Sequence, residues 1–214
     1  MNVGVAIPCY DKHVQFIPIL LDNISKQTIK PTHVVISCSS YYKDYCMNFI
    51  YESIDITIKF TSKKLYAAAN RNIAASMLNT DIISFFDCDD MMHPRRIEAI
   101  LQAFTLTTKD VFYHGFSYET SDHRLDTFPD IDEFIIDKYK MLKDPKAVGL
   151  MVESHIDRPT HGHVSLRKKV LDIVKFREEP SFYGMEDSVF GADLIAHNIS
   201  IGHISNNLSR YLYL

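Results

Sequence analysis

The chain has 214 residues, of which 46% are hydrophobic and 23% are charged, and its formal net charge is -4. This composition excludes an intrinsically disordered chain, and the negative charge argues against a general nucleic-acid-binding protein. The length predicts one α/β domain, or one domain with a small appendage. No stretch reaches the roughly 20 apolar residues that a membrane span needs, and the N-terminus lacks the basic region of a signal peptide.

No CxxC spacing occurs among the four cysteines, which are Cys9, Cys38, Cys46 and Cys88. Cys9, Cys38 and Cys88 lie at or near the ends of predicted strands, and small buried thiols are expected there rather than disulfides or metal ligands. A cytoplasmic location suits such a chain better than a secreted one. The sequence leaves open whether the chain is one domain of a longer protein.

The first half of the chain alternates between predicted strands and helices. In chain order these are a strand over Val3–Ile7, a helix over Phe16–Lys26, strands over Thr32–Ser37 and Ile54–Phe60, a helix over Tyr66–Asn79, a strand over Ile82–Phe86, a helix over Pro94–Leu106 and a strand over Val111–His114. This alternation predicts the α/β fold class, with a mainly parallel sheet flanked by helices and joined by right-handed crossovers.

The second half is less regular. Residues 121–158 are charged and weakly periodic, with a short helix predicted over Glu133–Leu142. A long insertion of this kind is either a functional lid or an ordinary surface excursion. The remaining predicted elements are a strand over His163–Leu166, helices over Lys168–Val174 and Glu186–Asn198, and strands over Ile199–Ile204 and Leu208–Leu212.

The most informative motif is an Asp-x-Asp that follows the buried strand Ile82–Phe86. Asp87 and Asp89 are two residues apart at the carboxyl end of this strand, which is where ligands bind in open α/β sheets. Such a pair can share one divalent cation, which in turn binds a diphosphate. Alternatively, the acids belong to a solvated loop, or Asp89 or Asp90 caps the helix that follows.

Three further motifs accompany the Asp-x-Asp in a fixed order. They are Ile7-Pro8-Cys9-Tyr10-Asp11 at the end of the first strand, Ala69-Asn70-Arg71-Asn72 on the helix before the Asp-x-Asp, and Gly184-Met185-Glu186-Asp187 at the start of a late helix. In this order the chain resembles the GT-A glycosyltransferases, family 2 most closely, over roughly residues 3–212. It also resembles virus-encoded members of that class.

The resemblance implies a single GT-A domain over residues 1–214. Residues 1–115 would bind the nucleotide sugar and residues 116–214 the acceptor. The implied activity is the metal-dependent transfer of a hexose or deoxyhexose from a nucleoside diphosphate sugar, a UDP-sugar by preference, to a hydroxyl of a glycan or glycoprotein. The implied cofactor is Mn²⁺ or Mg²⁺, and the stereochemistry leans to inversion.

The resemblance also implies roles for individual residues. Asp87 and Asp89 would hold the metal and the donor, and His203 would complete the metal site, unless it is an ordinary histidine at a strand end. Asp187 would be the catalytic base, and Glu186 would contact the acceptor. Both acids could instead simply favour the helix dipole.

Arg71 is expected to bind the diphosphate or the base, or to be a surface charge of its helix. The other residues implied on the donor side are Pro8, Tyr10, Asp11, Ser37 and Cys88. Ser37-Cys38-Ser39-Ser40 stands where many members carry an acid that binds the base or ribose, so Asp11 or hydroxyl groups would take over that role. Lys63 and Lys64 are expected to form a solvated pair, and His161 and His163 are candidate acceptor contacts.

Two other functions compete with this one. A sugar-1-phosphate nucleotidyltransferase shares the layout and the use of Mg²⁺, but it needs a glycine-rich loop after the first strand, and Pro8-Cys9-Tyr10-Asp11 has no glycine. A non-catalytic domain that binds nucleotide sugars would not need Glu186 and Asp187.

Overall fold

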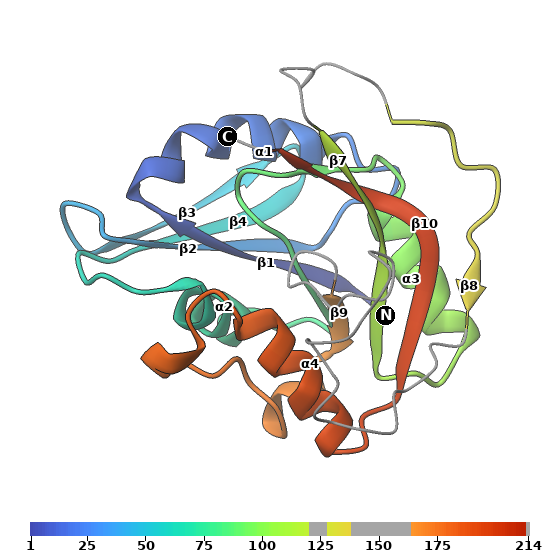
Figure 1. Ribbon diagram of the computed structural model, residues 1–214. Coiled ribbons are helices and arrows are strands. Elements are labelled where there is room, and N and C mark those ends of the chain that lie inside the picture. The colour runs from blue at the N-terminus through green and yellow to red at the C-terminus, as the bar shows by residue number, and fades with distance from the viewer. Residues whose placement is uncertain (120–127, 138–163, 213–214) are drawn as a thin grey trace.

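The computed structural model describes residues 1–119, 128–137 and 164–212, and its core is one mixed sheet with helices on both faces (Figure 1). The N-terminal half supplies four strands that pair in parallel. They are β1 (Val3–Tyr10), β2 (His33–Ser39), β4 (Ile54–Phe60) and β5 (Ile82–Phe85), in the spatial order β4-β2-β1-β5. The predicted α/β class and the parallel pairing of these strands are confirmed.

The chain after β5 extends the same sheet with mixed pairing. Its strands are β6 (Met91–Met92), β7 (Val111–Glu119), β8 (Ile136–Asp137), β9 (Val164–Arg167) and β10 (Ile201–Leu212). Strand β9 lies antiparallel between β5 and β7, and β7 pairs in parallel with β10. The sheet is therefore parallel from β4 through β2 and β1 to β5, and mixed beyond β5.

Two apolar layers hold the helices on the sheet. Helices α1 (Ile17–Ser25) and α3 (Arg96–Leu106) pack on one face, and α2 (Ala67–Ser76) and α4 (Glu186–Ala196) pack on the other. Alternate residues of β1 serve the two layers. Burial on both faces explains why the central strands are continuous apolar runs. None of the described helices has the length and apolar character needed to cross a membrane.

Several predicted elements need correction. The helix predicted over Glu133–Leu142 is wrong in its described part, where Ile136–Asp137 forms β8 against β10; long-range pairing overrides local helix propensity there. The rest of that helix lies outside the described residues, as does the predicted insertion over residues 121–158 except for 128–137. The helix predicted over Lys168–Val174 is a 3₁₀ turn at Lys168–Asp172.

The C-terminal and edge strands also differ from expectation. The two predicted closing strands form one strand, β10, and the polar residues between them lie at two register shifts against β7 rather than in a turn. The edge strand β3 (Tyr45–Tyr51) was not predicted; it pairs antiparallel with β4 and is largely exposed, so it lacks the apolar run of a central strand. A 3₁₀ turn, Asp11–Phe16, precedes α1.

Candidate active site

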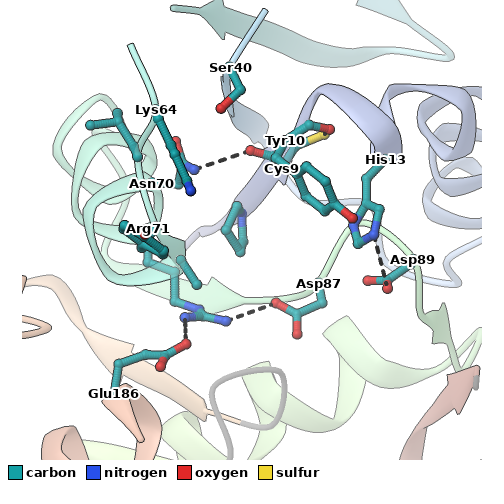
Figure 2. A pocket seen from close by; sticks show the side chains of 14 residues that line it. Cys9, Tyr10, His13, Ser40, Lys64, Asn70, Arg71, Asp87, Asp89 and Glu186 are labelled. Carbon is teal, nitrogen blue, oxygen red and sulfur yellow. Dashed lines mark hydrogen bonds and ion pairs between the residues drawn. The ribbon is translucent and has the colours of Figure 1, made fainter. Parts of the chain in front are cut away.

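One cavity of about 440 Å³ lies at the carboxyl ends of the parallel strands, beside the start of α2 (Figure 2). Its walls come from the ends of β1 and β2, the segment before α2, the Asp-x-Asp and the start of α4. The lining residues are Pro8, Cys9, Tyr10, His13, Ser40, Lys64, Leu65, Tyr66, Ala67, Asn70, Arg71, Asp87, Asp89 and Glu186. The four predicted motifs therefore all contribute to one site.

The register of the sheet explains why these motifs meet. Strands β1 and β5 run in parallel, with Ala6 opposite Phe85, and the Phe86 N–H donates to the Ala6 carbonyl at 3.1 Å. Pro8 and Asp87 each follow this pair by two residues, so both emerge at the same edge of the sheet.

Asn70 fixes the two strand ends beneath the cavity. Its Nδ2 donates to the Cys9 carbonyl at 3.2 Å and to Ser39 Oγ at 2.9 Å, and its Oδ1 accepts from Ser37 Oγ at 2.9 Å. Ser37 is fully buried and does not line the cavity. The predicted donor contact at Ser37 is therefore replaced by a structural role, and Ser40 is the serine of this segment that lines the cavity.

Arg71 joins two acids that are far apart in the sequence. Its Nη2 lies 3.2 Å from Asp87 Oδ1 and its Nη1 lies 3.0 Å from Glu186 Oε1 (Figure 2). The guanidinium is 2% exposed and packs over the Phe176 ring at 5.5 Å. Burial raises the pKa of Asp87, and the charge of Arg71 opposes that rise. Each Nη thus binds one carboxylate and keeps a second N–H, whereas Nε of Arg71 is buried and has no hydrogen-bond partner among the described residues.

His13 lies beside the second acid of the Asp-x-Asp. Its Nε2 is 3.8 Å from Asp89 Oδ2, and its ring packs against Tyr10 at 4.1 Å. The sequence analysis missed His13 because no motif marks it; only its position three residues after Tyr10 suggests the site. Asp11 is exposed and Cys88 is buried in the core, so neither lines this cavity.

Asp87 and Asp89 offer the oxygen ligands that a hard divalent cation prefers, and Mg²⁺ commonly takes one or two carboxylates together with phosphate oxygens. The two carboxylates in one cavity therefore fit a cation that is bound jointly with a diphosphate. Within the described part of the chain, no group of three or more histidine, cysteine, aspartate or glutamate side chains could hold a metal ion.

The structure does not add His203 to these acids. His203 is buried in β10, three strands away from β5 in the sheet, which is about 14 Å at ~4.8 Å per strand. The predicted metal set of Asp87, Asp89 and His203 is not brought together: β10 meets the segment after the Asp-x-Asp at Ser209 and Arg210, six or more residues beyond His203. The other candidate histidines, His161 and His163, lie outside the described residues.

Glu186 and Asp187 occupy the first turn of α4 but face different surroundings. Glu186 lines the cavity, where Oε1 accepts from Arg71 and Oε2 accepts from the Gly184 N–H at 2.9 Å. Asp187 is half-buried beside the cavity wall, and its Oδ1 accepts from the Ser188 N–H at 2.7 Å. Burial raises the pKa of Asp187, which makes its carboxylate a stronger base than an exposed aspartate.

Two exposed residues at the cavity, Lys64 and Tyr66, were not expected at the site; the sequence analysis treated Lys64 as half of a solvated pair and did not consider Tyr66. Lys64 lines the cavity, unlike Lys63, and its Nζ lies 5.2 Å from the ring of Tyr66. Tyr66 lines it too, just before α2 begins.

Solved structures of S. aureus TarS have a fold similar to that of this chain. One is S. aureus TarS 1-349 in complex with UDP, with a TM-score of 0.68 and 16% identity, covering 100% of this chain and 61% of that one. The same protein in complex with UDP-GlcNAc also has a TM-score of 0.68 and 16% identity, with 100% and 59% covered. The chain thus spans about three fifths of the length of these TarS structures.

The sequence itself matches the model of glycosyl transferase family 2 over residues 4–171. The chain therefore belongs to glycosyl transferase family 2, as the order of its motifs indicates. Among curated proteins, none matches it significantly.

Proposed function

We propose that this glycosyltransferase moves a sugar from a UDP-sugar to a hydroxyl of a glycan or glycoconjugate, with a divalent cation at the donor. The observation that carries the proposal is the meeting of Asp87, Asp89, Arg71 and Glu186 in one cavity. The TarS complexes with UDP and UDP-GlcNAc support the choice of donor, because TarS shares the fold.

Two basic residues of the donor half, Arg71 and Lys64, line the cavity and would bind the diphosphate. Arg71 is surrounded by two carboxylates, so much of its charge is already balanced, and the second N–H of each Nη would donate to a donor oxygen. Lys64 lines the same cavity with an exposed ammonium group. We therefore assign the main contact with the diphosphate to Lys64 and a supporting contact to Arg71.

Asp87 and Asp89 would hold the cation. When bound, a divalent cation stabilises the negative charge of the departing diphosphate. A positive charge at Asp87 would also favour the ionised form of a carboxylate whose pKa burial raises. Pro8, Tyr10 and Ser40 line the remaining wall of the cavity, where they would face the nucleoside.

The acceptor would approach from the start of α4. Asp187 would take the proton of the attacking hydroxyl, and Glu186, held by Arg71, would contact the acceptor. A base that acts directly on the acceptor gives inversion at the sugar carbon. Residues 1–115 then bind the donor and 116–214 the acceptor. The free cysteines Cys9, Cys38, Cys46 and Cys88 are compatible with the reducing cytoplasm.

The test is to titrate the protein with UDP, UDP-GlcNAc, UDP-glucose and GDP-mannose by calorimetry, with and without Mn²⁺. Release of UDP from the preferred donor is then followed over time. We expect UDP compounds to bind more tightly when Mn²⁺ is present and UDP to be released slowly by hydrolysis. Binding without any release indicates a non-catalytic domain, and formation of pyrophosphate from UTP and a sugar phosphate indicates a nucleotidyltransferase.

A further inference from the structure

Two exposed tyrosines stack on one another at the edge of the cavity. The rings of Tyr66 and Tyr183 lie 3.5 Å apart with an interplanar angle of 23°. Their residues are 40% and 37% exposed, so the pair sits at the surface rather than in the core. Tyr66 immediately precedes α2, whereas Tyr183 lies three residues before Glu186 at the start of α4. The stack therefore connects the donor half to the segment that carries the acidic pair.

A second contact ties down the same segment. Arg71 Nη1 binds Glu186 Oε1 at 3.0 Å, and Arg71 lies on α2, the helix that Tyr66 precedes. Gly184, between Tyr183 and Glu186, has a φ of 79°, a conformation that favours glycine. The segment from Tyr183 to Glu186 is thus held at both ends against α2, with a sharp bend between the two contacts.

Local hydrogen bonds shape the start of α4: the Gly184 N–H donates to Glu186 Oε2 at 2.9 Å and the Ser188 N–H donates to Asp187 Oδ1 at 2.7 Å. Its N-cap residue, Met185, makes no side-chain cap hydrogen bond and is 53% exposed. A helix end without a capping side chain frays more readily. The contacts at Tyr183 and at Arg71 join this first turn to α2, which the local hydrogen bonds do not do.

We propose that Tyr66 and Tyr183 are positioning residues that form a clasp, and that this clasp sets the acidic pair of α4 over the donor cavity. The inference rests on the proposed function for its catalytic consequence. Opening the clasp releases the first turn of α4, so Glu186 and Asp187 spend less time in the catalytic arrangement. Tyr183 does not line the cavity, so its effect falls on turnover rather than on nucleotide binding.

The test compares Tyr183→Ala, Tyr183→Phe and the double variant Tyr66→Ala/Tyr183→Ala with the wild type. The probes are UDP for binding and UDP-GlcNAc for turnover, both with Mn²⁺. Tyr183→Ala should lower kcat between about two- and tenfold, the range that one aromatic pair supplies, and leave the Kd for UDP unchanged. Tyr183→Phe keeps the ring and should restore kcat. Tyr42→Ala, which removes an exposed tyrosine stacked on Tyr41, is the matched control and should leave kcat unchanged.

Amide hydrogen exchange over residues 184–190 gives a readout that needs no substrate. Tyr183→Ala should speed exchange there, Tyr183→Phe and Tyr42→Ala should not, and the double variant should match Tyr183→Ala because the two rings act as one unit. Exchange that is unchanged in Tyr183→Ala overturns the clasp for any donor. A wild type that neither binds UDP nor hydrolyses UDP-GlcNAc overturns the proposed function instead, while faster exchange would still support the clasp.

Discussion

Arg71 Nη1 lies 3.0 Å from Glu186 Oε1, although 115 positions separate the two residues in the sequence. The other Nη of the same guanidinium binds Asp87 at the end of β5. Arg71 therefore connects the Asp-x-Asp to the acidic pair of α4, and its charge balances two carboxylates that would otherwise repel each other. Loss of this one side chain should disturb the folded state and the donor site together.

We expect Arg71→Ala to destabilise the protein by about 3–5 kcal/mol, because it removes the partner of a buried ion pair. Arg71→Lys keeps the charge but cannot bind two carboxylates as a planar guanidinium does, so its cost should be intermediate. Urea unfolding measures both. Arg177→Ala is the control: Arg177 is 46% exposed in its pair with Asp193, and it should cost no more than about 1 kcal/mol. Equal costs at the two sites would contradict a special role for Arg71.

The second prediction concerns the cation. Asp89→Ala should abolish the gain in UDP affinity that Mn²⁺ provides, because Asp89 offers one of the two carboxylates that line the cavity. Calorimetric titration of UDP with and without Mn²⁺ measures this gain. Asp22→Ala, which removes an exposed carboxylate of α1 that pairs with Lys26, should keep it. Equal UDP affinity in wild type and Asp89→Ala, with or without Mn²⁺, would remove the metal site from the proposal.

The third prediction separates two neighbouring lysines. Lys64 lines the cavity and Lys63 does not, so Lys64→Ala should weaken UDP binding by about 1.5–3 kcal/mol, the worth of a hydrogen bond to a charged group. Lys63→Ala should have little effect. The loss at Lys64 should shrink as ionic strength rises, because an exposed charge is screened by salt. If both variants bind UDP like the wild type, the diphosphate depends on other groups.

Much of the fold follows from local patterns. The bounds of β4 match the predicted Ile54–Phe60, and α1 begins at Ile17, one residue after the predicted start at Phe16. These elements are buried against the sheet, so their apolar pattern is strong. The pattern fails where pairing is long-range: β3 is an exposed edge strand, and β8 exists only because β10 lies beside it.

The sequence likewise predicts the motifs of the candidate site but not the contacts between them. The motifs containing Asp87, Asp89, Arg71 and Glu186 were expected to be functional, and the fold brings them into one cavity. Their partners were not predictable, because the bond between Arg71 and Glu186 and the stack of Tyr66 on Tyr183 depend on where α4 packs. Ser37 and His203 lie apart from the cavity. The resemblance implied roles for both at the site, but Ser37 binds Asn70 in the core and β10 lies three strands from β5.

The fourth prediction is a pH dependence of stability. Burial raises the pKa of Asp187 above the ordinary value of 3.8, so between these two pKa values the folded state binds more protons than the unfolded state. The free energy of unfolding should therefore fall as pH rises through this window. Asp187→Asn should be more stable than the wild type at pH 7, but this advantage should disappear at a pH below 3.8, where Asp187 is protonated in both the folded and the unfolded state. Asp110→Asn should show the opposite difference at pH 7, because Lys169 and Ser200 outweigh burial and lower the pKa of Asp110. Urea unfolding at both pH values tests the signs.

The last prediction is that Asp187 removes the acceptor proton. Asp187→Asn keeps the size of the side chain but cannot accept a proton, and general base catalysis contributes about 10²–10⁴-fold. Transfer should slow by that factor while the Kd for UDP stays unchanged, because the donor cavity is built by other residues. Glu186→Gln keeps the shape of the side chain but loses its charge. It should therefore change the KM for the acceptor more than the KM for the donor. Transfer by Asp187→Asn at the wild-type rate would mean that another group is the base or that the reaction retains configuration. The anomeric configuration of the product, determined by NMR, distinguishes these two cases: an inverted product calls for a different base, and a retained one replaces direct attack by a mechanism that needs no base at Asp187.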